Sequence, residues 1–314
     1  MKHILLFLLF NIILNCGGAI LRKKEDNTTR NLTVGALVLN SQRRTSTAQS
    51  VTTINFSVRA NSTVTTDVSC SGTIPATIAN TTNSTLKDAR FYIHDVNLLS
   101  ADGSKTPFNI TTDNQWQIAA GSNSFGSYPG VALLDFEDGT NNCAGGTTET
   151  NKSIRGTSVA GNYTGVEFKV GVPFYLNHLQ SSTAAAPLNI TAMYWAWNSG
   201  YKFAKIEFTA SSANLFHLGS GTCSGNSSGP VNECGLPNRP TISVSKTSGN
   251  FDSSIDKIVL DINALYNGAD ATGTGINTCM AGNANTACQP IIRNIGVNPS
   301  DGKTLTTQSA FSIK

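Results

Sequence analysis

Charged residues are scarce in this chain, and they form no concentrated patch along the sequence. Asp, Glu, Lys and Arg make up 13% of the 314 residues, and the formal net charge is only +3. The basic residues cluster only at positions 22–24 and 43–44. Because binding to nucleic acid needs a dense basic surface, this distribution argues against a nucleic-acid partner.

The common catalytic motifs are also missing. The sequence has no Gly-X-Ser-X-Gly, no P-loop, no His-Glu-X-X-His and no dinucleotide-binding fingerprint. Ser and Asp are plentiful, but nothing marks one Ser as a nucleophile. The sequence therefore predicts a protein that performs no catalysis of its own.

One apolar run is present, at the N-terminus. Residues 4–14 are almost all apolar, follow Lys2 and end just before Cys16. Such a run is too short to span a bilayer and is typical of a secretory signal. A Cys directly after it resembles a bacterial lipobox, although Asn15 stands where a small residue is usual. An ordinary signal peptide, cut nearby with the loss of Cys16, is the alternative.

We therefore expect residues 1–15 to be a signal peptide, Cys16 to be lipidated and residues 16–50 to form a polar tether. The lipid would anchor the protein to the outer membrane, facing either the periplasm or the cell surface. The remaining residues, 51–314, are then the folded domain.

Six further cysteines suit an exported protein with three disulfides. The shortest loops pair Cys223 with Cys234 and Cys279 with Cys288, which leaves Cys70 with Cys143 by elimination. None of these spacings matches a zinc finger.

The apolar pattern repeats every two residues, which predicts strands. The expected strands are residues 54–60, 91–99, 131–134, 166–170, 241–244 and 258–262, with a hairpin of 188–197 and 201–208 around Asn198-Ser199-Gly200. Residues 261–266 could instead form a short helix. We therefore predict a mainly β fold, an antiparallel sandwich or barrel-like single domain with long loops.

Three features within these strands contain residues that could form a binding site. In a strand, Met193, Trp195 and Trp197 would share one face, as in an aromatic core stripe. Residues 135–139 (DFEDG) lack the ligand spacing of an EF-hand, so we expect a turn with solvated charges. Alternation places His94 on the same face as Tyr92 and Val96.

His94, His178 and His217 are the histidines outside the signal peptide, and each is flanked by large apolar residues. Any one of them alone is more typical of a core or turn residue than of a metal ligand. Together, in an exported domain, they favour a metal site modestly.

Several of these segments together resemble the MbnP-like copper-binding proteins, also described as the four-Cys-motif member of a metallo-mystery pair. The match lies in residues 91–96 (FYIHDV), 131–140 (VALLDFEDGT) with Cys143 after it, 170–178 (VGVPFYLNH), 188–203 (LNITAMYWAWNSGYKF) and 216–223 (FHLGSGTC), continuing to Cys234 and Asn238-Arg239-Pro240. The likeness runs from about residue 50 to the C-terminus.

The resemblance implies a periplasmic or surface protein that binds one copper ion. It also implies a partner, a MauG-like dihaem cytochrome c peroxidase (MbnH-like), that oxidises the first Trp of a Trp-X-Trp motif to kynurenine. Trp195 is the matching residue here, and Trp197 is the second Trp.

An indole N–H only donates hydrogen bonds, whereas the opened ring offers an amine and a carbonyl as ligands. Cu(I) prefers soft or imidazole ligands, so the expected set is His94, His178, His217 and modified Trp195, with Met193 or Met280 as further candidates. Two alternatives stay open. One is a structural or adhesive surface lipoprotein that holds no metal, and the other is a three-histidine zinc site.

Overall fold

The computed structural model describes residues 50–224, 234–273, 276–280 and 285–314. The predictions for Cys16 and for the segments preceding residue 50 lie outside this part of the chain. Within it, no helix is long and apolar enough to cross a membrane.

Strands dominate the described residues. They are β1 (Thr53–Arg59), β2 (Thr85–Ser100), β3 (Lys105–Pro107), β4 (Asn109–Ile110), β5 (Gln117–Ile118), β6 (Gly121–Asn123), β7 (Gly126–Tyr128), β8 (Val131–Asp135), β9 (Ser153–Thr157), β10 (Tyr163–Val170), β11 (Tyr194–Ala196), β12 (Gly200–Tyr201), β13 (Ala204–Thr209), β14 (Ala213–Leu218), β15 (Thr241–Ser245), β16 (Lys257–Asp261), β17 (Thr278–Met280) and β18 (Phe311–Ile313). The helical elements are α1 (Phe174–Asn177), α2 (Ile262–Leu265), α3 (Gln289–Asn294) and the 3₁₀ turns η1 (Asn141–Cys143), η2 (Thr191–Met193) and η3 (Thr286–Cys288).

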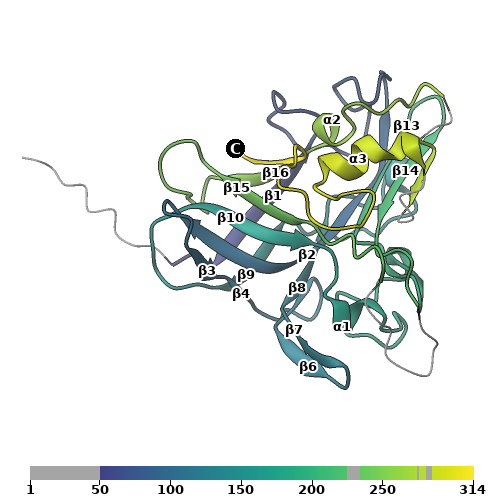
Figure 1. Ribbon diagram of the computed structural model, residues 1–314. Coiled ribbons are helices and arrows are strands. Elements are labelled where there is room, and N and C mark those ends of the chain that lie inside the picture. Colours follow the sequence, from purple (N-terminus) through teal and green to yellow (C-terminus); the bar gives the residue numbers. More distant parts are fainter. Residues whose placement is uncertain (1–49, 225–233, 274–275, 281–284) are drawn as a thin grey trace, which may run out of the picture. The chain divides into compact units, whose positions relative to one another are not determined.

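Two large open sheets form the domain (Figure 1). The first has five strands in the order β18-β16-β1-β9-β4. The second has nine, with β15-β10-β2-β13-β14-β17 as its path and β3, β5 and β8 joined to it through β2. Most neighbours are antiparallel, but β1 pairs with β16 and β14 with β17 in parallel. The prediction of a mainly β domain is confirmed, with mixed sheets that do not close into a barrel.

Phenylalanines join the two sheets face to face. Phe56 and Phe311 of the five-stranded sheet contact Phe91 and Phe168 of the nine-stranded sheet, with ring centroids 5.4–6.2 Å apart. All four are buried, and burial of aromatic surface is a main source of stability in such a core. The alternating apolar pattern in β1 and β10 points these rings inward.

The long strand β2 lies between β10, β13 and β8 in the nine-stranded sheet. Both of its faces are buried along most of its length, so charged side chains on the face away from the core are enclosed as well. This enclosed outer face carries the candidate site.

The three disulfides are Cys70–Cys143, Cys223–Cys234 and Cys279–Cys288, as expected from the sequence. The short helix that residues 261–266 offered as an alternative to a strand is present, as α2, and the side chain of Asp261 caps it by accepting from the N–H of Ala264.

The predicted hairpin around residues 198–200 exists in a shorter form. Only β11 and β12 pair there, whereas β13 leaves to join β2 and β14. Since β11 covers Tyr194–Ala196 alone, Met193 precedes it in η2 and Trp197 follows it. The expectation that Met193, Trp195 and Trp197 share one strand face is therefore wrong.

Candidate metal centre

Pairing of five strands sets a line of polar residues on one face of the nine-stranded sheet. Met280 of β17 is level with His217 of β14, His217 with Lys205 of β13, Lys205 with Arg90 of β2, and Arg90 with Asp135 of β8. Residues level with one another across neighbouring strands point to the same side of a sheet. The register thus brings together residues that are far apart in the sequence.

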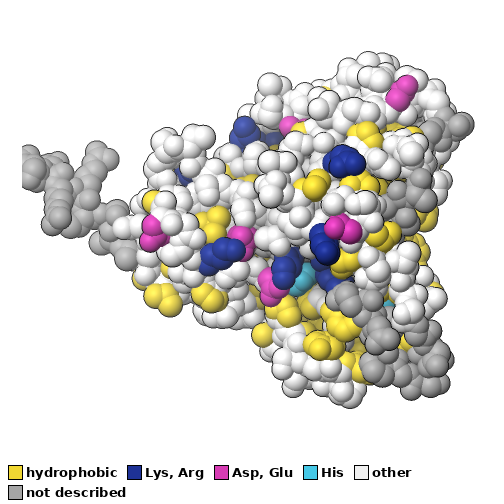
Figure 2. Space-filling model, in the orientation of Figure 1, with side chains coloured by type: hydrophobic (Ala, Val, Ile, Leu, Met, Phe, Trp, Pro, Cys, Tyr) yellow, Lys and Arg dark blue, Asp and Glu magenta, His cyan; other side chains and the backbone are white. Residues whose placement is uncertain are grey.

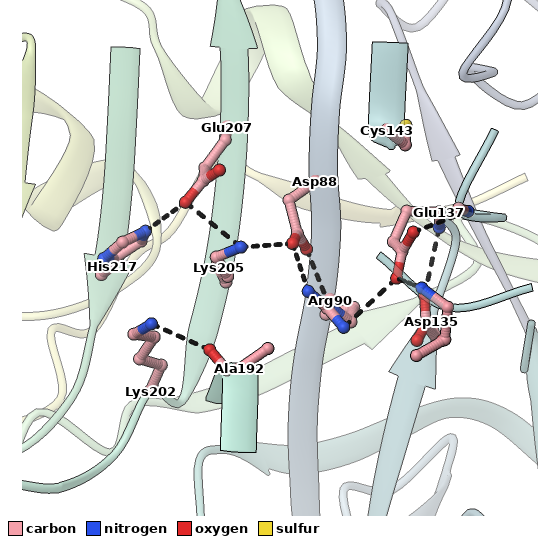
Figure 3. Close-up of polar contacts among 12 residues, drawn as sticks. Asp88, Arg90, Asp135, Glu137, Cys143, Ala192, Lys202, Lys205, Glu207 and His217 are labelled. Atoms are coloured by element: carbon pink, nitrogen blue, oxygen red, sulfur yellow. Dashed lines mark hydrogen bonds and ion pairs between the residues drawn. The ribbon is translucent and has the colours of Figure 1, made fainter. Parts of the chain in front are cut away.

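Ion pairs connect this line into a continuous chain of alternating charge (Figure 3). We call it the charged row, and its members are His217, Glu207, Lys205, Asp88, Arg90 and Glu137. Asp88 accepts two hydrogen bonds from Arg90 and also pairs with Lys205, with 2.5 Å from Nζ to Oδ2. Bonding to Asp88 raises the pKa of Arg90 despite its burial. The guanidinium therefore stays charged inside the protein.

Glu137 fixes the far end of the charged row. Its carboxylate lies 3.2 Å from Nη1 of Arg90 and accepts the backbone N–H groups of Gly139 and Thr147. A Cβ at Gly146 would overlap this carboxylate, so only glycine fits there. Glu137 thereby holds the loop that follows β8.

The prediction of solvated charges at residues 135–139 is wrong for Asp135 and Glu137, which are both fully buried. The reason is Arg90, which lies opposite them on β2 and compensates the charge of Glu137. Oδ2 of Asp135 has no hydrogen-bond partner among the described residues. Burial raises the pKa of Asp135 to about 8, so this carboxyl is protonated at neutral pH.

His217 ends the charged row. Its Nε2 lies 2.5 Å from Oε1 of Glu207. Burial alone would raise the pKa of Glu207, but the contacts with His217 and Lys205 outweigh it and lower that pKa. The other ring nitrogen, Nδ1 of His217, is buried without a hydrogen-bond partner among the described residues. A buried nitrogen without a partner is costly in a folded protein unless a ligand occupies it.

Trp195 lies beside this imidazole, with ring centroids 6.3 Å apart. It lines a surface hollow of about 490 Å³, which we call the tryptophan hollow and which residues 198–199, 220–223 and Met280 complete. A Cβ at Gly219 would lie 2.4 Å from Cζ3 of Trp195, so the glycine lets the indole pack on the backbone just after β14. Met280 is partly exposed in this hollow, whereas Met193 is buried and does not line it.

His178 approaches the same region from α1. Its Nδ1 donates to the carbonyl of Trp197 at 2.7 Å, which leaves the lone pair on Nε2. Nε2 lies 3.2 Å from the side-chain nitrogen of Asn177 and 3.7 Å from Sγ of Cys234. His178, Cys223 and Cys234 form a group with metal-ligand spacing, but the disulfide removes both thiolates as ligands.

His94 lies in a separate hollow of about 540 Å³, whose lining includes no tryptophan and no other histidine. Its Nδ1 donates to the carbonyl of Gly171, and burial lowers its pKa to about 4. Lys169 and Arg239 line the same hollow, and on the face drawn in Figure 2 basic side chains meet acidic ones and a histidine. Asp95 pairs with Lys169 in this hollow, but Arg239 and Lys303 add further positive charge to its lining, which disfavours a metal cation.

The expected alternation around His94 is wrong on one side. Asp95 adopts a left-handed φ of 51°, and the pairing of β2 with β10 shifts by one residue at this point. The resulting bulge reverses the alternation, so Asn97 follows His94 on its face in place of Val96.

The donor atoms at the tryptophan hollow fit a soft or borderline metal. The fit rests on the thioether of Met280, which lines the hollow, and on Nδ1 of His217, a buried nitrogen in a ring that packs against Trp195 but does not itself line the hollow. The sequence singled out His217, Trp195 and Met280 but missed the charged row. Its only signal was the charged residues at alternate positions in β2 and β13, a pattern that usually marks a solvent-exposed face.

Comparison with known proteins decides the family. The family model for MbnP matches residues 49–281. The chain belongs to the MbnP family. MbnP from Methylosinus trichosporium has a solved structure that is similar to this one, with a TM-score of 0.66 and 25% sequence identity over 84% of this chain and 98% of that chain. No curated protein sequence matches the chain significantly. The MbnP model spans the whole charged row and the tryptophan hollow.

Replacing Asp135 by Asn should stabilise this MbnP-family domain at neutral pH. The native carboxyl keeps a proton that the unfolded chain loses above about pH 4, so the wild type loses stability as pH rises toward 8. Urea unfolding should show a gain of about 1–2 kcal/mol for Asp135→Asn at pH 8 and a smaller gain at pH 5.

The control is Asp256→Asn. Asp256 is buried too, but both of its oxygens accept hydrogen bonds from Lys246 at 2.8 Å, so this variant should lose about 3 kcal/mol. A loss of stability in both variants would show that Asp135 is ionised in the native protein.

Proposed function

We propose that this protein binds one copper ion at the tryptophan hollow and acts in copper homeostasis. The observation that carries the proposal is Nδ1 of His217, which is buried in a ring next to Trp195 and has no hydrogen-bond partner among the described residues. Membership of the MbnP family supports it. A bound Cu(I) would give this nitrogen a partner that the described part of the chain does not supply.

Trp195 must change chemically before it can contribute a ligand, because an indole N–H has no lone pair for a metal. Oxidative opening to kynurenine provides an aromatic amine and a carbonyl at the same position. Trp195 is partly exposed in the hollow, so an external oxidising partner can reach it. Trp197 is also partly exposed, but it does not line the hollow and packs on His178, with ring centroids 6.1 Å apart.

His217 and modified Trp195 form the centre of the proposed ligand set. Met280 adds a soft sulfur from β17, level with His217. His178 is the second imidazole of the proposed set, because its Nε2 lies 3.7 Å from Sγ of Cys234, whose disulfide partner Cys223 lines the hollow. His94 does not take part, because its hollow is separate and lined by cationic side chains.

The wider role follows from the same family. We propose that a dihaem peroxidase-like enzyme of the MauG type oxidises Trp195 and that this chain is its substrate, with no catalysis of its own. Lipidation at Cys16 would hold the protein on the outer membrane, on the periplasmic or outer side, where it meets this partner.

Coexpression with the dihaem partner should convert Trp195 and load the protein with copper. Peptide mass mapping of residues 188–202 should show a gain of about 4 Da at Trp195 and no change at Trp197. Trp195→Phe should stay free of copper even with the partner, whereas the matched Trp197→Phe should still bind it. Full copper loading with an intact Trp195 would disprove the dependence on oxidation.

Loss of the His217 imidazole should abolish copper binding without unfolding the domain. His217→Gln removes the nitrogen beside Trp195, so we expect copper stoichiometry by elemental analysis to fall to near zero. The matched His94→Gln keeps a donor for the carbonyl of Gly171 and should retain copper. Loss of copper in the His94 variant, with retention in the His217 variant, would place the site in the wrong hollow.

A further inference from the structure

The contact between His217 and Glu207 determines which ring nitrogen carries the proton. A carboxylate only accepts hydrogen bonds, so Nε2 of His217 must donate to Oε1 of Glu207. In a neutral imidazole this places the lone pair on Nδ1, the nitrogen without a partner among the described residues. The fold therefore selects one of the two tautomers.

Glu207 cannot easily turn away from His217, because it is held from the other side. Nζ of Lys205 lies 3.4 Å from Oε1 of Glu207 and 2.5 Å from Oδ2 of Asp88. Glu207 is also level with Asp88 in the pairing of β13 with β2. Lys205 thus sits between two carboxylates and fixes both.

The rest of the charged row anchors this arrangement within the sheet (Figure 3). Asp88 is bonded twice by Arg90, and Arg90 pairs with Glu137, whose other partners are backbone N–H groups. The side chains of Arg90 and Glu137 are fully buried. Freeing any interior member would leave a neighbouring charge unpaired in a buried place, which is strongly unfavourable.

We propose that Glu207 is a positioning residue that holds His217 as the Nε2–H tautomer, with the lone pair on Nδ1 of the ring that packs against Trp195 of the tryptophan hollow. The charged row keeps Glu207 in place. Metal-binding imidazoles commonly donate their other N–H to a carboxylate in this way. The link to copper rests on the proposed function, whereas the tautomer is a property of the metal-free protein.

The test uses copper-free protein with unmodified Trp195, labelled with ¹⁵N at its histidines. Two-dimensional NMR should show His217 as the Nε2–H tautomer in the wild type. Glu207→Met removes the acceptor and should give a mixture of tautomers. Glu207→Asp serves as a second variant in case the Met variant fails to fold. It keeps the negative charge next to Lys205 but shortens the side chain by one methylene, so it should also give a mixture of tautomers. Glu207→Gln keeps an acceptor and should restore the wild-type tautomer.

The matched control is Glu167→Met in the same sheet. Glu167 is also a largely buried carboxylate that is ion-paired, to Lys105, and it accepts from Ser243. We expect Glu167→Met to lose stability but to leave the His217 tautomer unchanged. A purely structural role for Glu207 would give this same result, so an unchanged tautomer in Glu207→Met and Glu207→Asp would overturn the proposal.

The second readout is Cu(I) affinity, measured by competition with a chromogenic chelator after exposure to the oxidising partner. Glu207→Met removes the carboxylate that accepts a hydrogen bond from the ligating His217, and this should weaken Cu(I) binding roughly 10- to 100-fold. Glu167→Met should bind as tightly as the wild type, and equal affinity in both variants would contradict the proposal. A wild type that binds no copper would refute the proposed function, and the NMR result would still decide the tautomer.

Discussion

Burial of alternating charges on one face of the nine-stranded sheet is the constraint on which the candidate site depends. Taking ions out of water is costly, and the cost is recovered only when each charge meets an opposite one at close range. In the charged row this condition sets the position of every interior member. Lys205 lies between Glu207 and Asp88, and Arg90 lies between Asp88 and Glu137. Rigidity at His217 is a consequence of these pairings.

At the tryptophan hollow, a residue held in place by the charged row lies next to a more accessible residue. His217 is fixed through Glu207, whereas Trp195 comes from a short hairpin and rests on the backbone of Gly219. The indole is partly exposed, as its proposed chemical modification requires, and the imidazole is buried. Under the proposed function, the exposed indole would be accessible to an external enzyme and the buried imidazole would be preorganised as a ligand.

Local sequence patterns predicted β1, β2, β8, β10, β13, β15, β16 and all three disulfides, and they offered the short helix α2 as an alternative, because each depends on residues that are close together or few in number. The length of β11 and the bulge at Asp95 could not be predicted, since pairing with distant strands determines both. The burial of Asp135 and Glu137 could not be predicted from the sequence for the same reason. Arg90, which lies opposite Asp135 and compensates the charge of Glu137, comes from a strand some 45 residues earlier, and no local pattern links it to these two residues.

The central claim is that Nδ1 of His217 is a copper ligand while Glu207 holds Nε2. Anomalous diffraction at the copper edge, from crystals of protein modified by its partner and loaded with Cu(I), tests it most directly. We expect copper in the tryptophan hollow at about 2.0–2.1 Å from Nδ1, a typical metal–imidazole distance, with the bond from Nε2 to Glu207 intact. Copper bound to Nε2 of His217, or located beside His94, would contradict it.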